Sequence, residues 1–154
     1  MTTRETAARA AFKAGYNCSQ SVVAACADLL DMDKDMAVKI VSSYGGGMGR
    51  LREVCGAVSG MFFVAGYLYG YSDPKDYQGK KEHYARIQEL ASAFREENGS
   101  IVCRELLGEK GKDTSHVPDK RTEEYYKKRP CEEMVASAVR ILEEYIKINE
   151  KYCK

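Results

Sequence analysis

The middle of the chain contains the uncharged stretch VCGAVSGMFFVAGYLYGYS, residues 54–72. Its length is close to the ~20 residues that a helix needs to cross a bilayer. However, four glycines, Ser59 and three tyrosines interrupt it. Its apolar positions Val54, Val58 and Met61 follow the spacing of one helix face. We therefore predict a buried core helix over residues 51–70 and no membrane span.

The sequence on both sides of this stretch also has helical periodicity, and no segment alternates with period two. Asn17 with Gln20 three residues later predicts a capped helix start. Pro130 suits the first position of a last helix. A first helix should stop near residue 15, and the others should cover residues 17–30, 33–44, 51–70, 75–98, 101–107 and 130–152. Residues 122–128 are a candidate for a further short helix. The sequence thus predicts an all-α, single-domain helical bundle of about six to seven helices over residues 1–154.

Composition narrows the class of protein. A chain of 154 residues fits one domain, since single domains usually run about 100–200 residues. It has 24 Lys and Arg against 23 Asp and Glu, which argues against a nucleic-acid partner. Residues 1–6 lack the apolar region of a secretory signal, so we expect a cytoplasmic protein. Clustered cysteines in such a reducing compartment are more often catalytic or metal-binding than disulfide-bonded.

The six cysteines are the most informative residues. Cys26 falls in the middle of an expected helix, which is typical of core packing, and Cys153 lies in the C-terminal tail. The other four lie at or near the starts of expected helices, and they are Cys18, Cys55, Cys103 and Cys131.

A helix start favours the thiolate form of cysteine, because free backbone N–H groups place about half a positive charge there. Arg50 and Arg52 would add to this effect at Cys55. Four thiolates from four helices would supply the ligands of an iron–sulfur cluster or a tetrahedral zinc site. Cysteine is also a small apolar residue, so core packing alone is the alternative.

Spacing excludes several other sites. No Cys-x-x-Cys occurs, which excludes a thioredoxin motif, haem attachment and an ordinary zinc ribbon.

The run Tyr44-Gly-Gly-Gly-Met-Gly-Arg50 matches neither nucleotide-binding fingerprint, so we expect no nucleotide. We interpret the run as a tight turn that needs positive φ, and an anion-binding loop is the less favoured alternative. Gly56 and Gly60 suggest close approach of another helix or, less favoured, of a cofactor beside Cys55. The segment 119–129 carries both signs of charge and is interpreted as exposed surface.

The stretch Cys55-Gly-Ala-Val-Ser-Gly60 resembles the core of the C-GCAxxG-C-C family, whose members are described as redox-active proteins. The family label reads Gly-Cys-Ala, whereas this chain reads Cys-Gly-Ala. The outlying cysteines map in order, with Asn17-Cys-Ser-Gln20 upstream and Cys103 and Cys131 downstream. The resemblance covers residues 12–142 and implies a redox role without specifying a reaction.

Three functions are compatible with these residues. The favoured one is electron transfer by an iron–sulfur cluster, with zinc as a less favoured metal, bound by Cys18, Cys55, Cys103 and Cys131 beside Gly56, Gly60 and Arg50. The second is a thiol–disulfide oxidoreductase in which Cys55 is the attacking thiolate and another of the four cysteines resolves. The third is a non-catalytic helical interaction module. We expect a redox partner of unknown identity, and the apolar helix faces are compatible with a homodimer.

Overall fold

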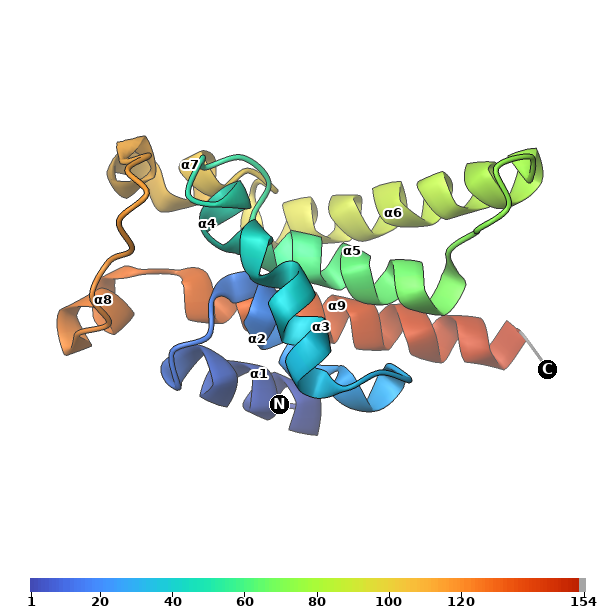
Figure 1. The fold of residues 1–154 in the computed structure, drawn as a ribbon, viewed down its shortest axis with the longest axis horizontal. Coiled ribbons are helices and arrows are strands. Elements are labelled where there is room, and N and C mark those ends of the chain that lie inside the picture. The colour runs from blue at the N-terminus through green and yellow to red at the C-terminus, as the bar shows by residue number, and fades with distance from the viewer. Residues whose placement is uncertain (153–154) are drawn as a thin grey trace.

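The computed structural model describes residues 1–152, and their regular structure is helical (Figure 1). This confirms the all-α fold class. One isolated antiparallel bridge, between Val54 and Val102, is found within the described range. The elements, with η for 3-10 helices, are α1 (Thr3–Lys13), α2 (Cys18–Ala25), η1 (Ala27–Leu29), α3 (Lys34–Ile40), η2 (Val41–Tyr44), α4 (Gly45–Met48), α5 (Gly56–Tyr69), α6 (Tyr77–Asn98), α7 (Cys103–Leu107), η3 (Gly108–Lys112), α8 (Glu123–Lys128) and α9 (Cys131–Tyr152).

Helix α5 lies in the middle of the bundle, because most of its own side chains are apolar and are buried against neighbouring helices. It packs against α2, α6 and α9, and α1 covers α2 and α9 from the other side (Figure 1). Val58, Met61 and Val64 have no exposed surface. Each such side chain stabilises the fold by about 1.5–3 kcal/mol relative to full exposure. The prediction of a buried core helix is confirmed, and no helix within residues 1–152 has the length and hydropathy to cross a bilayer.

The start of α2 has the predicted cap. The Asn17 side chain accepts a hydrogen bond from the Gln20 amide (2.9 Å), and the Gln20 side chain accepts one from the Asn17 amide (3.1 Å). Asn17 also donates to the Ser42 carbonyl (3.1 Å), which ties α2 to η2. Helix α2 ends earlier than predicted, at Ala25, because the backbone of Cys26 leaves the helical region and a 3-10 turn follows.

The glycine run, which includes α4, folds as a left-handed turn, because the backbone inside α4 is not helical at Gly46 and Gly47. The angle φ is positive at five consecutive residues from Gly46 to Arg50 and again at Arg52, with values between 61° and 73°. This region costs a non-glycine residue about 1–2 kcal/mol, because its Cβ approaches the following carbonyl oxygen. Glycine at positions 46, 47 and 49 avoids that cost, which confirms the predicted need for positive φ. The turn also moves the start of α5 from the predicted residue 51 to Gly56.

Gly60 and Gly66 lie on the same helix, and we expect alanine to have opposite effects on stability at these positions. A Cβ at Gly60 would lie 2.8 Å from the Ser19 carbonyl oxygen, whereas at Gly66 the nearest atom would be 4.0 Å away. Gly66→Ala should raise the free energy of unfolding by up to about 1 kcal/mol through helix propensity. Gly60→Ala should lower it by about 1–2 kcal/mol, because overpacking outweighs that gain. Urea unfolding measures both, and a stabilised Gly60→Ala protein would contradict the close contact of α2 and α5.

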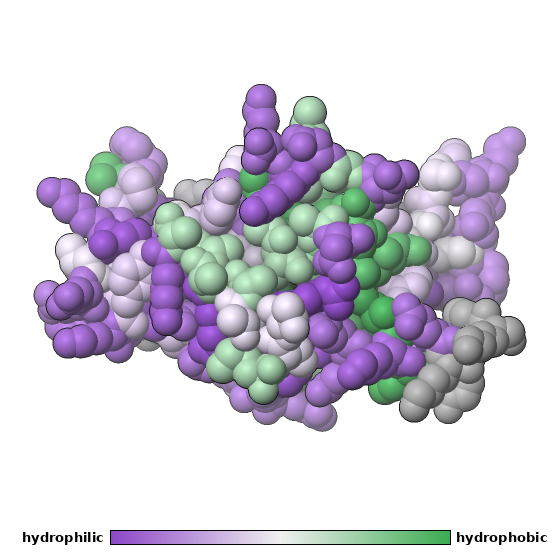
Figure 2. All heavy atoms as spheres, turned by 90° about the horizontal axis from the view of Figure 1, so that it is seen from below, coloured by the Kyte–Doolittle hydropathy of each residue, from purple (hydrophilic) through white to green (hydrophobic). Residues whose placement is uncertain are grey.

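The surface mixes charged and apolar regions. Apolar side chains gather over the middle of the face shown in Figure 2, and hydrophilic ones lie toward both ends. The exposed large apolar residues include Met36, Ile40, Leu51 and Tyr67. The fold does not identify a partner for these residues, so the homodimer stays a prediction.

Candidate functional site

The four helix-start cysteines come together at one end of the bundle, where they line the same cavity of about 190 Å³. Cys18, Cys103 and Cys131 are the first residues of α2, α7 and α9, and Cys55 directly precedes α5. This end lies on the left in Figure 1, near α4 and α8. Cys26 is fully buried in the apolar core and does not line the cavity. Cys153 lies outside the described residues.

A short antiparallel pairing orients two of these cysteines. Val54 lies opposite Val102, and on either side of this pair the chains exchange backbone hydrogen bonds. The Cys55 amide donates to the Ile101 carbonyl (2.8 Å), and the Cys103 amide donates to the Glu53 carbonyl (2.6 Å). Because side chains alternate across paired strands, Cys55 and Cys103 lie on the face opposite the two valines. The bridge therefore directs both thiols to the same side.

Glycines bring neighbouring segments close to the cysteines. A Cβ at Gly47 would lie 2.6 Å from the Cys103 Cβ, and one at Gly56 would lie 3.1 Å from the Cys18 Cβ. Both glycines line the cavity. Gly60 lies outside it, against Ser19 and Val22 of α2. This contact supports the role of Gly60 in helix packing, and its role beside a cofactor stays a prediction.

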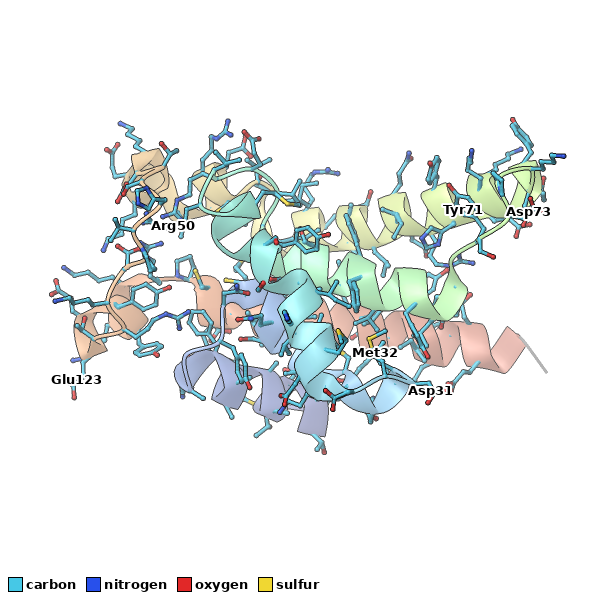
Figure 3. The ribbon with its side chains drawn as sticks, viewed as in Figure 1. Asp31, Met32, Arg50, Tyr71, Asp73 and Glu123 are labelled. Atoms are coloured by element: carbon cyan, nitrogen blue, oxygen red, sulfur yellow. The ribbon has the colours of Figure 1, made fainter. Side chains whose placement is uncertain are left out.

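Arg50 connects the glycine turn to the segment before α8, as Figure 3 shows. Its guanidinium donates to the Ser115 carbonyl and lies 3.4 Å from the Asp113 carboxylate and 3.2 Å from the Asp119 carboxylate. The predicted place of Arg50 beside the cysteines agrees with its position in the cavity wall. Its charge is shared with these carboxylates.

Two further arginines of the cavity were missed by sequence reasoning. Arg121 and Arg129 both line it, and the Arg129 side chain is only 6% exposed, so the interpretation of segment 119–129 as exposed surface is wrong for them. Arg121 donates to the Phe12 carbonyl (2.9 Å), and its guanidinium lies 4.3 Å from the Phe12 ring centre. These contacts fold the segment back over the end of α1. No local pattern separates these arginines from neighbouring charged residues.

Cys131 has the lowest pKa of the four thiols. Hydrogen bonding with the Cys18 thiol is the largest cause, and Arg129, Arg121 and Arg52 add to it, so the pKa of Cys131 falls to about 7 although burial acts in the opposite direction. The same interaction, together with burial, raises the pKa of Cys18 well above its ordinary value. The pair therefore favours the thiolate at Cys131 and the protonated thiol at Cys18.

At Cys55 and Cys103 burial is the largest influence on the pKa, and it raises the pKa of both thiols. Burial raises the pKa of Cys55 to about 12, although the backbone N–H groups of Val58 and Ala57 partly offset it. Burial also raises the pKa of Cys103, and Arg52, whose Nη1 lies 3.8 Å from the Cys103 sulfur, opposes this. The raised pKa does not favour Cys55 as the activated thiolate, and that role stays a prediction. Loss of solvation at Cys55 outweighs the helix start.

The described cysteines Cys18, Cys26, Cys55, Cys103 and Cys131 are free thiols. Among the described residues, no group of three or more His, Cys, Asp or Glu side chains is arranged to hold a metal ion. A metal or cluster in the cavity therefore stays a prediction.

The profile of the C_GCAxxG_C_C family, described as "Putative redox-active protein", matches residues 16–145. The chain belongs to this family. The match includes the four cavity cysteines and confirms the resemblance seen at residues 55–60. No curated protein matches the chain significantly, and no solved structure does. Membership in the C_GCAxxG_C_C family thus associates the cysteines with redox activity. It does not specify a reaction, so a proposal for the reaction has to be argued from the geometry of the cavity.

Proposed function

We propose that this member of the C_GCAxxG_C_C family is a dithiol oxidoreductase in which Cys131 attacks a disulfide and Cys18 resolves the intermediate. The observation that carries the proposal is the contact between Cys131, with a pKa of about 7, and the protonated Cys18. Both residues are partly exposed, whereas Cys55 and Cys103 are 5% and 8% exposed. A thiolate is the form that attacks disulfides, and a second nearby thiol completes the exchange.

The reaction proceeds in two displacements. The Cys131 thiolate attacks one sulfur of the substrate disulfide, forms a mixed disulfide and releases the other half as a thiolate. Cys18 then loses its proton to a released thiolate and attacks the Cys131 sulfur. This breaks the mixed disulfide, releases the second half and forms a Cys18–Cys131 disulfide. Two electrons pass to the substrate, and an external dithiol restores the reduced protein by the same chemistry.

Alkylation of Cys131 by iodoacetamide should follow its low pKa. The thiolate predominates above a pH of about 7 and is lost as the pH falls through that value, so the rate should rise with pH and then level off. A lower pKa also weakens the nucleophile, with a Brønsted coefficient of about 0.4–0.5, so we expect a rate roughly fivefold above an ordinary thiol at neutral pH. Timed alkylation followed by peptide mass spectrometry measures the midpoint.

Two substitutions at Cys18 provide the matched controls. Cys18→Ser keeps an O–H donor and should leave the midpoint near 7, whereas Cys18→Ala removes the donor and should move the midpoint upward. Equal midpoints in the two variants would show that hydrogen bonding from residue 18 does not activate Cys131.

The iron–sulfur or zinc site predicted from the sequence is the second candidate. Its support is that four sulfurs and four guanidinium groups line the same cavity, since the cations would offset the charge of bound thiolates. Protein purified without oxygen would then contain stoichiometric iron and sulfide, or zinc, and Cys18→Ser would lose it. Metal-free protein that oxidises reversibly to a Cys18–Cys131 disulfide would exclude this candidate.

A further inference from the structure

Positive charge dominates the cavity that holds Cys18 and Cys131. Among its described lining residues, Asp119 is the one carboxylate beside four arginines. Asp119 is already shared between Arg50 (3.2 Å) and Arg129 (2.6 Å), and Asp113, outside the lining, lies 3.4 Å from Arg50. Even with Cys131 as a thiolate, four cations therefore face three anions. The remaining charge favours an anionic ligand.

Arg52 contributes a donor that the described part of the chain leaves unpaired. The residue is 3% exposed and lines the cavity. Its Nε donates to the Asp113 carbonyl (2.9 Å), its Nη1 has only the Cys103 sulfur at 3.8 Å, and its Nη2 is buried without a hydrogen-bond partner. A buried charged donor without an acceptor destabilises the fold, so a ligand that supplies the acceptor would remove this cost.

The backbone conformation of Arg52 also supports a ligand at this residue. Its φ is +64°, which a non-glycine residue adopts only at a cost and mainly where the surrounding structure requires it. The hydrogen bonds of Glu53 and Arg104 to the glycine turn and to the Arg52 carbonyl hold this segment in place. The guanidinium is therefore fixed before any ligand arrives, which reduces the entropy lost on binding.

We infer that the cavity binds a small disulfide whose substituents carry carboxylate groups, and that Arg52 binds one carboxylate beside the reacting sulfurs. This inference rests on the proposed dithiol function. The fork of a guanidinium matches a carboxylate with two parallel hydrogen bonds, and two nitrogens of Arg52 are free or weakly engaged.

The size of the cavity agrees with a small substrate. Its volume of about 190 Å³ lies below the roughly 300–1,000 Å³ of pockets for drug-sized ligands. Leu106, Leu107 and Met134 form an apolar part of its wall, which suits the short carbon chain between a sulfur and a carboxylate. A disulfide within a folded protein would bring more chain than this space admits.

Two alkylating reagents test the inference on the intact protein. Iodoacetate and iodoacetamide both lose iodide to a thiolate, and they differ by a carboxylate in place of an amide. We divide the rate with iodoacetate by the rate with iodoacetamide at Cys131, and we normalise this ratio by the same ratio for a small free thiol. The normalised ratio should be on the order of ten, because one charge-assisted hydrogen bond to the carboxylate stabilises the bound reagent by about that factor. Arg52→Met should reduce the normalised ratio to about one.

Arg104→Met is the matched control for the loss of a cation. Arg104 follows Cys103 but lies outside the cavity lining, with its side chain half exposed and paired with Glu53 at 2.6 Å. This variant should keep the high ratio. As a readout that does not depend on the folding of Arg52→Met, the unmodified protein should also be oxidised by 3,3′-dithiodipropionate, bis(2-hydroxyethyl) disulfide and cystamine. Each rate is divided by the rate of a small free thiol with the same disulfide, since the leaving thiols differ in pKa, and the normalised rates should decrease in that order.

The outcomes separate the two proposals. If Cys131 reacts with both reagents no faster than a free thiol, the dithiol function fails. If iodoacetamide reacts fast but the normalised ratio is near one, and the normalised rates of the three disulfides are equal, the dithiol function stands and the anionic substrate is overturned.

Discussion

Replacing Cys131 with serine should reduce the rate of disulfide reduction by at least about 100-fold at neutral pH, because a hydroxyl is not ionised there and the other thiols are protonated. Burial raises the pKa of Cys55 to about 12, so this thiol is protonated at neutral pH and does not replace Cys131. Single-turnover mixing of the reduced protein with bis(2-hydroxyethyl) disulfide, followed by quantification of the released thiol, measures the loss.

Three further variants locate the reaction. Cys18→Ser should accumulate a mixed disulfide on Cys131, detectable by mass, because the resolving thiol is missing. Cys55→Ala should keep most of the rate, and so should Cys26→Ala, which lies outside the cavity. If Cys131→Ser exchanges at the parent rate while Cys55→Ala does not, the attacking thiolate is at Cys55 after all.

Gly47→Ala should destabilise the protein and disturb the site together. Gly47 has a φ of +73°, and an added Cβ would lie 2.6 Å from the Cys103 Cβ and 2.9 Å from the Arg52 Cα. We expect the free energy of unfolding to fall by about 3 kcal/mol, from about 1–2 kcal/mol for the left-handed backbone and a similar amount for overpacking. Urea unfolding with comparison of m-values measures it.

Gly49→Ala is the matched control within the same turn. Gly49 has a φ of +61°, but its Cβ would meet only the Ser43 carbonyl oxygen at 3.8 Å. This variant should lose only about 1–2 kcal/mol, the cost of the left-handed backbone alone. Equal losses in the two variants would mean that Cys103 does not pack tightly against the glycine turn.

Much of the fold follows from local patterns in the sequence. The uncharged stretch over residues 54–72 predicted the buried helix α5, and Asn17 with Gln20 predicted the capped start of α2. The start of α5 was harder to predict, because the left-handed turn includes Met48, Arg50 and Arg52, which have no intrinsic preference for positive φ. Tertiary contacts of the turn with Cys103 hold these residues there.

The sequence by itself determined which cysteines begin helices, because capping and periodicity are properties of neighbouring residues. Only the tertiary structure decided that the pKa is lowered at Cys131 and raised at Cys55, and that Arg121 and Arg129 belong to the cavity. The reason is that solvation and charge act through space, between groups such as Cys18 and Cys131 that lie far apart along the chain.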